Sequence, residues 1–387
     1  MRSGWVVAVA FVAASLAACA DDGAGPKGGT PTSTTAATSG ATSASPSAPG
    51  SSSPSAGEPE PPPAVDLTIV GDLMLVRGVA DGRRALAPMA GLLRSADLTV
   101  GNLEQTLSTD GEPTQGGDSF GGSPADLDLL RWAGFDAVSL ANNHLGDYGE
   151  RALLETVDLL SDGPVRAFGA GRTARAAARP LLLEARGTTF AFLGFNAIGE
   201  TPMATATTPG ALSVRMPPRT GPLQQADLDR VTAAVRRADR VADAVVVLPH
   251  WGTQYTHVPE PVQHRVARAL VAAGADLVVG GHPHWVQGVE QISGVPVLHS
   301  LGNFVFDMDW EPQVMQGVML ETTWRGPELI SLRLVPYAMD PATFAPRVVD
   351  GEVAADILRD VASTTSPSAG PLVRCLTSSP SRRVCTP

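Results

Sequence analysis

The chain has 387 residues, a formal net charge of −11 at pH 7, 33 prolines and 40 glycines. Nucleic-acid binding needs a positive surface, so this charge argues against a DNA or RNA partner, and an acidic ligand would need a local cation such as a metal ion. The three cysteines, Cys19, Cys375 and Cys385, include no C-x-x-C pair, which excludes the thiolate-rich zinc modules.

The first segment predicted is an export signal at residues 1–19. Arg2 precedes an apolar run from Trp5 to Ala18, which is shorter than the about 20 residues of a spanning helix. Leu16-Ala17-Ala18-Cys19 resembles a bacterial lipobox, and this resemblance implies cleavage before Cys19 and lipidation of its thiol. The alternative is an ordinary cleaved signal that happens to contain a cysteine. The expected location is the cell membrane, lipid-anchored on the extracytoplasmic side.

Residues 20–64 are predicted to be a disordered tether. They consist of Ser, Thr, Pro, Ala and Gly with scattered charge and show no apolar periodicity. Such a segment cannot bury enough apolar surface to offset the entropy lost on ordering.

Order is expected to begin at Val65, where apolar runs of strand length alternate with helix-like segments. The strand candidates are 67–70, 98–101, 137–140, 190–195, 244–248, 277–279 and 295–299, and the helix candidates are 83–95, 124–133, 150–160, 224–238 and 261–273. This alternation indicates an α/β domain over residues 65–340, with its sheet covered on both faces. Runs at 318–323 and 329–336 follow without a helix and predict a hairpin at one edge.

The apolar pattern weakens after Met339. Residues 341–387 are therefore interpreted as a C-terminal extension that ends in a loose tail from Thr364 onward. Cys375 and Cys385 are close enough in sequence to form a small disulfide loop in an oxidising compartment, with two free thiols as the alternative.

Polar side chains follow the first two predicted strands. Asp72 comes directly after the first apolar run, and Asn102 and Glu104 come after the second. A carboxylate at the carboxyl end of an α/β strand faces the crevice where such folds bind ligands. Each pattern also has a structural explanation, because Gly-Asp is a common turn pair and Asn a common helix N-cap.

Histidines follow three later strand ends. Asn143 and His144 come after the third run, His250 after the run at 244–248, and His282 and His284 after the run at 277–279. His-x-His spacing places both imidazoles on one side of an extended backbone. A lone histidine is usually structural, but four of the seven histidines stand at these ends. The oxygen and nitrogen donors together suit Mn, Fe or Zn and two-metal hydrolysis.

No Gly-x-Ser-x-Gly elbow, P-loop or dinucleotide fingerprint competes with this interpretation.

Six motifs in chain order carry a family resemblance. They are Gly71-Asp72-Leu73-Met74-Leu75, Gly101-Asn102-Leu103-Glu104, Ala141-Asn142-Asn143-His144, His250-Trp251-Gly252, Gly281-His282-Pro283-His284 and Ser300-Leu301-Gly302-Asn303-Phe304-Val305-Phe306-Asp307. Over roughly residues 65–339 the chain resembles the CapA family of capsule and poly-γ-glutamate biosynthesis proteins, distant relatives of the calcineurin-like metallophosphoesterases. The resemblance implies an α/β sandwich of mixed sheets flanked by helices. It also implies one or two divalent metal ions, Mn, Fe or Zn, at the strand ends.

The resemblance also implies roles for individual residues. The metal ligands would be Asp72, Glu104, Asn143, His250, His282 and His284, with Glu104 in the bridging position. His144 would donate a proton to the leaving group, and Asn102, Trp251 and Asn303 would bind substrate. Three positions depart from the family pattern: Met74 replaces a histidine of the phosphoesterases, Gln254 replaces a glutamate, and Gly281 replaces a histidine.

Three functions are open at this point. One is a metal-dependent hydrolase that cleaves a phosphoester or amide in an anionic envelope polymer or its precursor. Another is a non-catalytic component of polymer synthesis or export, placed by its lipid anchor beside capsule synthase components. The last is a scaffold or polymer-binding lipoprotein with a vestigial metal site, which Met74 makes plausible.

Overall fold

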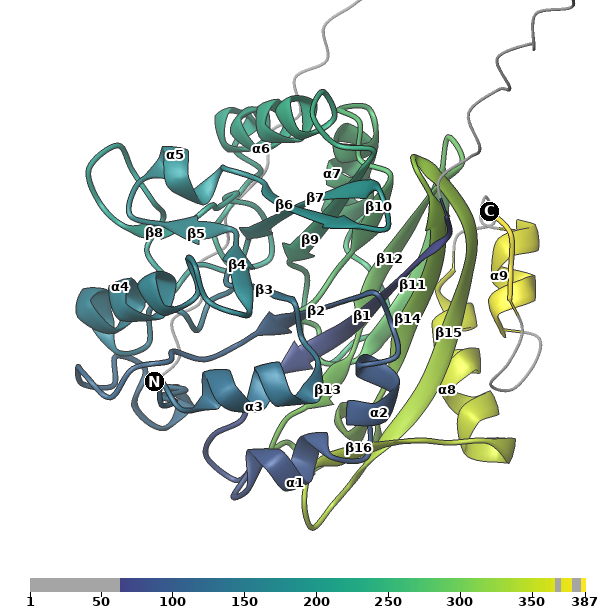
Figure 1. Cartoon of the computed structure of the whole chain (residues 1–387), viewed down its shortest axis with the longest axis horizontal. Coiled ribbons are helices and arrows are strands. Elements are labelled where there is room, and N and C mark those ends of the chain that lie inside the picture. Colours follow the sequence, from purple (N-terminus) through teal and green to yellow (C-terminus); the bar gives the residue numbers. More distant parts are fainter. Residues whose placement is uncertain (1–62, 366–369, 378–383) are drawn as a thin grey trace, which may run out of the picture. The chain divides into compact units, whose positions relative to one another are not determined.

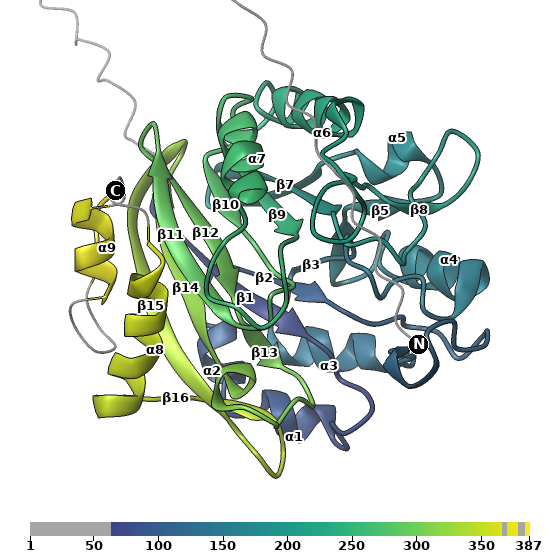
Figure 2. The same ribbon diagram turned by 180° about the vertical axis from the view of Figure 1, so that it is seen from behind.

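Two facing β-sheets with helices on their outer sides form the folded part of the chain. The computed structural model describes residues 63–365, 370–377 and 384–387. The export signal, Cys19 and residues 20–62 of the predicted tether lie outside these ranges. Figure 1 shows the sheets crossing the middle of the molecule, and Figure 2 shows them from behind.

The first sheet combines a parallel half with an antiparallel half. Its strand order is β16-β15-β14-β1-β2-β3-β4, and β13 also pairs with β1. The strands are β1 (Val65–Leu73), β2 (Leu98–Leu103), β3 (Ala137–Ser139), β4 (Arg166–Phe168), β13 (Asn303–Val305), β14 (Gln316–Arg325), β15 (Glu328–Asp340) and β16 (Ala345–Val348). β1 to β4 are parallel, whereas β14 to β16 are antiparallel. The predicted hairpin is β14 and β15, and β16 lies outside it as the edge strand.

The second sheet has a parallel centre and antiparallel edges, in the order β11-β12-β10-β9-β7-β6. Its strands are β6 (Leu181–Ala185), β7 (Thr188–Asn196), β9 (Ala244–His250), β10 (Leu277–Val279), β11 (Val286–Ile292) and β12 (Val295–Leu301). A separate pair, β5 (Ala170–Gly171) and β8 (Gly210–Ala211), is antiparallel.

Side-chain alternation along the strands separates the layers. The core between the sheets takes Val65, Leu67 and Ile69 of β1 together with Ala244, Val246 and Leu248 of β9. The intervening residues of β9, Val245 and Val247, face the helices outside the second sheet. Successive side chains of a strand point to opposite faces, so strands covered on both faces appear as unbroken apolar runs.

Helices cover both outer faces and give four layers. Against the first sheet pack α1 (Gly82–Leu86), α2 (Ala90–Leu93), α3 (Asp126–Ala133) and α4 (Gly149–Leu159), and against the second pack α5 (Ala174–Ala177), α6 (Gln225–Ala238) and α7 (Pro261–Val271). Two short 3₁₀ turns are η1 (Gly116–Asp118) and η2 (Pro312–Met315). The predicted sandwich of mixed sheets flanked by helices is confirmed.

The predicted helix at 83–95 is two short helices instead. Pro88 lies between α1 and α2. A proline has no backbone N–H and clashes with the preceding turn, so it ends the first helix.

The C-terminal extension packs on the sandwich, so the prediction of a loose tail from Thr364 is wrong for the described residues. Helices α8 (Gly351–Ser363) and α9 (Gly370–Thr377) contribute Ile357, Leu358, Val361, Leu372 and Leu376 to the core between the sheets. Cys375 and Cys385 form a disulfide, and Cys385 pairs with Leu332 of β15 through two backbone hydrogen bonds.

Within the described ranges, no helix has the length and apolar character needed to cross a membrane.

Candidate metal centre

The six predicted ligands meet where the parallel strands of both sheets end. Asp72 lies near the end of β1, Glu104 just after β2 and His250 at the end of β9, while Asn143 follows β3. His282 and His284 follow β10. All six are buried, with at most 3% of each residue exposed. The fold therefore brings the six residues together, and their role as metal ligands remains a prediction.

A β-bulge aims Asp72 into the centre. The register between β1 and β2 shifts between Ile69 and Asp72, so Val70 and Gly71 together oppose one residue of β2. A bulge bends its strand and redirects the next side chain. Gly71 is needed because a Cβ there would lie 1.9 Å from the carbonyl oxygen of Gly302.

The two sheets are joined through Asp72. Its Oδ2 accepts a hydrogen bond from the His282 N–H at 2.9 Å, and its Oδ1 accepts one from Asn102 Nδ2 at 2.8 Å. Gly281 makes this close approach feasible, since a Cβ at that position would lie 2.5 Å from Asp72 Oδ1. The departure at position 281 from the family's histidine therefore fits the local packing of this chain.

Asn102 is a buried connector between three of the predicted ligands. Its Nδ2 lies 2.8 Å from Asp72 Oδ1, 3.0 Å from Glu104 Oε1 and 3.1 Å from His250 Nδ1. Its Oδ1 accepts from Asn142 Nδ2 at 3.1 Å. These contacts orient the ligands, and a contact of Asn102 with substrate remains a prediction.

The two histidines after β10 are held in a sparsely populated backbone conformation. His282 has φ of 94° and His284 has φ of 58°. Such conformations cost about 1–3 kcal/mol each and persist where surrounding contacts enforce them, commonly at functional sites. His284 Nδ1 lies 2.8 Å from Asn303 Oδ1 and 3.7 Å from Asp72 Oδ2.

Several potential metal-ligand atoms at the centre form no hydrogen bond within the protein. This observation tests whether a metal ion fits the site. Glu104 Oε2 and both ring nitrogens of His282 are buried without a hydrogen bond. One ligand atom each from Asp72, Glu104 and His284 lie within 4.8 Å of one another. Buried polar atoms are normally satisfied, and a carboxylate and imidazole set suits a divalent ion. The residues present therefore fit a metal ion.

The local electrostatics favour a cation. Burial, reinforced by the neighbouring Asp72 carboxylate, raises the pKa of Glu104 well above its usual value. Burial and the nearby imidazoles lower the pKa of both His250 and His282 well below the usual value for histidine. Neutral imidazoles are the form that binds metals, and a divalent ion would stabilise an ionised Glu104.

His144 lies beside the predicted ligands and is held by a carboxylate and an aromatic ring. Its Nδ1 lies 2.8 Å from Asp147 Oδ2, and its ring stacks on Phe120 with centroids 3.8 Å apart. Its Nε2 lies 2.9 Å from Asn143 Nδ2 and 4.0 Å from Glu104 Oε2. A carboxylate on Nδ1 fixes the tautomer and directs Nε2 toward the centre.

Two residues predicted to bind substrate lie behind the ligands. Trp251 is fully buried, and its indole N–H donates to the His299 carbonyl oxygen at 3.0 Å. Asn303 is equally buried and contacts His284. In this structure they support the ligands, and substrate contact by either of them remains a prediction.

Met74 packs in an apolar cluster with Phe120 and Phe306, whose rings contact His144 and His284. Its sulfur accepts a hydrogen bond from the Val76 N–H at 3.3 Å. The position that is a histidine in the phosphoesterase pattern therefore contributes packing here and no ligand atom.

Sequence analysis missed Asp147, Glu200 and Tyr255. Glu200 Oε2 accepts from Asn143 Nδ2 at 2.8 Å, and the Tyr255 ring stacks on His284 at 5.9 Å. Asp147 stands three residues after His144, which is the one sequence signal that was available. Glu200 and Tyr255 lie on loops with no periodic pattern, but both have positive φ.

Comparisons with known proteins agree with the family resemblance. The family model described as bacterial capsule synthesis protein PGA_cap matches residues 66–308. The chain belongs to this family. This match confirms the CapA resemblance, and it ends before β14, so the hairpin and the C-terminal helices lie outside the matched region.

Curated relatives of this family member include two Bacillus proteins. The capsule biosynthesis protein CapA of Bacillus anthracis is 31% identical over 255 residues, covering 63% of this chain and 60% of the relative. The PGA biosynthesis protein CapA of Bacillus subtilis (strain 168) is 30% identical over 253 residues, covering 63% of each protein. The chain thus spans about three fifths of the length of these relatives.

Among solved structures, the NAD nucleotidase of Haemophilus influenzae matches with a TM-score of 0.42 and 11% identity, covering 79% of this chain and 64% of that protein.

Proposed function

We propose that this capsule-synthesis family member is a metal-dependent hydrolase of the cell surface that takes part in making a poly-γ-glutamate type polymer. The observation that carries the proposal is the set of buried donor atoms without a protein partner, Glu104 Oε2 and both ring nitrogens of His282. Membership of the family supports the link to capsule polymers, and the printed names of the two Bacillus relatives agree with it.

Each residue has a defined part in this proposal. Asp72, Glu104, Asn143, His250, His282 and His284 would hold one or two ions of Mn, Fe or Zn. A divalent ion supplies Lewis-acid polarisation of a phosphoester or amide oxygen. His144, fixed through Asp147, delivers a proton from Nε2 to the leaving group. The side-chain amide of Asn102 contacts Asp72, Glu104 and His250 and holds the three side chains in position relative to one another.

The proposed location is the outer face of the cell membrane, with Cys19 as the lipid attachment site. The sequence Leu16-Ala17-Ala18-Cys19 supports it. The Cys375–Cys385 disulfide also supports it, because disulfides persist mainly in oxidising compartments outside the cytosol.

Metal content of the purified full chain tests the proposal. The wild type, supplied with Mn, Fe and Zn in separate samples, should retain near-stoichiometric metal after desalting. The His282→Ala/His284→Ala variant should lose it. A His257→Ala/His264→Ala variant removes two histidines outside the centre and should keep it. Each sample is then assayed on a generic phosphodiester and on a γ-glutamyl amide.

A wild type that takes up no divalent metal when metal is supplied contradicts the hydrolase. Metal without turnover on either bond type supports a second candidate, a non-catalytic scaffold or polymer-binding protein. Two observations favour that candidate. Met74 supplies no ligand atom, and His250 Nε2 lies 2.8 Å from Asn143 Oδ1, so two predicted ligands already bond to each other.

A further inference from the structure

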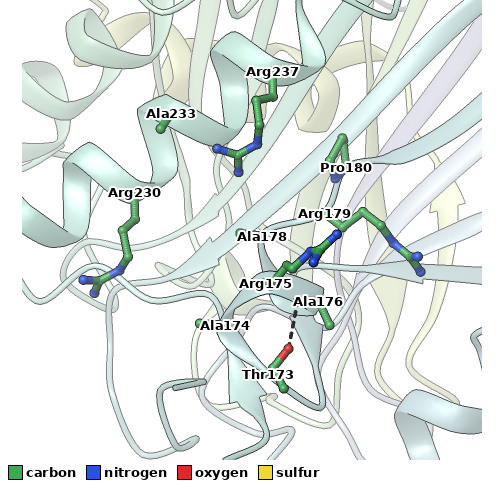
Figure 3. A pocket seen from close by; sticks show the side chains of 10 residues that line it. All are labelled: Thr173, Ala174, Arg175, Ala176, Ala178, Arg179, Pro180, Arg230, Ala233 and Arg237. Carbon is green, nitrogen blue, oxygen red and sulfur yellow. Dashed lines mark hydrogen bonds between the residues drawn. The ribbon is translucent and has the colours of Figure 1, made fainter. Parts of the chain in front are cut away.

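A pocket lined by four arginines lies between α6 and the segment around α5, separate from the residues of the metal centre. Its volume is about 940 Å³. Figure 3 shows Arg230 and Arg237 on α6 and Arg175 and Arg179 on the facing segment. All four side chains are exposed.

Three of these cations have no counter-charge. Among the described residues, the side chains of Arg175, Arg179 and Arg237 form no ion pair and no hydrogen bond, whereas Arg230 pairs with Asp227. Many other arginines are paired, as Arg172 is with Asp158. These unpaired arginines form a positively charged patch on a protein whose net charge is −11.

No carboxylate of the described part of the chain lines this first pocket. Its remaining lining residues are Thr173, Ala174, Ala176, Ala178, Pro180 and Ala233. Like charges held close together repel, and an anionic ligand removes that repulsion. The planar guanidinium group matches carboxylate and phosphate oxygens in pairs, which a lysine ammonium does not.

The small apolar lining distinguishes between anions. Methyl groups of four alanines and the Pro180 ring offer contact to an aliphatic carbon chain between the arginines. A ligand that carries carboxylates on methylene carbons satisfies both features. A phosphate backbone would satisfy the arginines alone.

The arginine lining extends into an adjoining cavity, where it is joined by two carboxylates, Asp158, which pairs with Arg172, and Asp162. Arg179, Ala176 and Pro180 also line a second cavity of about 620 Å³. Arg166 lines that cavity, and its Nε is buried without a hydrogen-bond partner. Two cavities that share Arg179, Ala176 and Pro180 as lining residues can accommodate an extended ligand, which would meet the guanidinium groups of Arg179 and Arg166.

We propose that the arginine pocket, defined by Arg175, Arg179, Arg230 and Arg237 and continued to Arg166, binds a segment of a polycarboxylate chain. The choice of a carboxylate polymer rests on the proposed function. The site itself rests on the unpaired arginines and does not involve the metal ligands. Through this pocket the protein would bind an anionic polymer even when no metal ion is bound.

Fluorescence anisotropy of the full chain in EDTA tests this, with a labelled γ-linked glutamate oligomer as the probe. The pocket variant is Arg175→Gln/Arg179→Gln/Arg237→Gln. The matched control, Arg84→Gln/Arg265→Gln/Arg325→Gln, removes three exposed arginines without ion pairs from α1, α7 and β14. We expect the pocket variant to bind at least about tenfold more weakly and the control within about twofold of wild type, with wild-type affinity falling as salt rises.

Equal weakening in both variants overturns the proposal, as does a wild type that does not bind in EDTA. A wild type that binds inorganic polyphosphate and not the glutamate oligomer overturns the choice of carboxylate. Circular dichroism melts verify that both variants remain folded. Metal content is measured on separate, metal-supplied portions of the same preparations without EDTA. A wild type that holds metal but does not bind the oligomer refutes the pocket alone, and a wild type that binds the oligomer but takes up no metal refutes the hydrolase alone.

Discussion

The molecule holds two groups of histidine and acidic side chains that could bind a metal ion, and the two groups differ in how far hydrogen bonds within the protein satisfy their polar atoms. At the metal centre, Glu104 Oε2 and both nitrogens of His282 have no partner. In the second group, defined by His264, Glu290 and His299 and called here the imidazole–carboxylate cluster, Glu290 Oε1 lies 3.0 Å from His264 Nδ1 and 3.1 Å from His299 Nε2. Three donor atoms in either group are close enough together to hold an ion.

The pKa shifts of the two glutamates run in opposite directions. Burial and Asp72 raise the pKa of Glu104 well above its usual value. Burial also acts to raise the pKa of Glu290, but the hydrogen bonds and charges of His264 and His299 outweigh it and hold that pKa at about 2. Glu104 lies beside another carboxylate, whereas Glu290 lies beside two histidines that hydrogen-bond to it.

The lesson concerns how an ion site is recognised. Proximity of ligand atoms is common to both groups, so it does not discriminate. The unpartnered Glu104 Oε2 does, because a buried carboxylate oxygen without a hydrogen-bond donor is costly unless a cation binds there. A metal at His299 Nε2 would also move the ring proton to Nδ1, where no acceptor lies, whereas histidine ligands normally donate that proton to a partner.

The same substitution at both glutamates gives the largest expected contrast. Glu104→Gln should weaken metal binding at least about a hundredfold, since loss of even an outer-shell partner costs about 10–100-fold. The metal-free variant should unfold at the same temperature as the metal-free wild type or higher, because the unpartnered Oε2 is no longer charged. Titration calorimetry and thermal melts in EDTA measure both quantities. Unchanged metal affinity would remove Glu104 from the ligand set.

Glu290→Gln should leave metal content unchanged and destabilise the fold. A buried, charged hydrogen-bond acceptor is lost, so the free energy of unfolding should fall by about 1–3 kcal/mol. Urea unfolding at neutral pH measures the loss, and metal analysis of the same samples is the control. A variant of wild-type stability that loses its metal would reverse the roles assigned to the two groups.

Gly281→Ala tests how tightly the metal centre is packed. The new Cβ would lie 2.5 Å from Asp72 Oδ1 and must displace that carboxylate. We expect about a tenfold loss of metal affinity, comparable to the effect of disturbing a ligand's orientation. Gly294→Ala, at a turn with open space around its Cβ, controls for removing a glycine, although its φ of 90° adds some local strain. Equal metal affinity in wild type and Gly281→Ala would show that Asp72 has room to move.

The smallest expected effect is the pH dependence of the imidazole–carboxylate cluster. Glu290 has a lower pKa folded than its reference value of 4.5, so its ionised form stabilises the fold above pH 4.5. That contribution is lost as the pH falls toward 2. The difference in unfolding free energy between wild type and Glu290→Gln should therefore narrow steadily in acid. Urea unfolding at a series of pH values measures it, and a difference that stays constant or widens would contradict the assigned pKa.

Much of the fold was predictable because its central strands are covered on both faces. β9 and β10 begin as continuous apolar runs, and the ligand positions that follow them are given by where those runs stop. Helix α8 was also within reach, since Ala354, Ile357, Leu358 and Val361 repeat at helical spacing along one buried face. Its signal was overlooked because the surrounding residues are polar.

Other features of the site have no local signature. Glu200 reaches Asn143 from a loop 57 residues away. The bulge that aims Asp72 depends on the pairing of β1 with β2, which exists only once both strands have met. The sequence also does not show that Glu290, inside β11, is paired with two histidines whereas Glu104 Oε2, just after β2, has no hydrogen-bond partner, because the partners of Glu290 come from distant parts of the chain or from the neighbouring strand.

The restriction of positive charge to arginine and histidine in the described residues has a practical consequence. Lys27 is the single lysine of the chain, and it lies outside the described ranges. Amine-directed reagents therefore have Lys27 and the chain's own α-amino group as targets. A dye or a sensor surface coupled through primary amines would attach at the N-terminal region. The arginine pocket, the metal centre and the imidazole–carboxylate cluster would all remain chemically unaltered and open to ligands in solution.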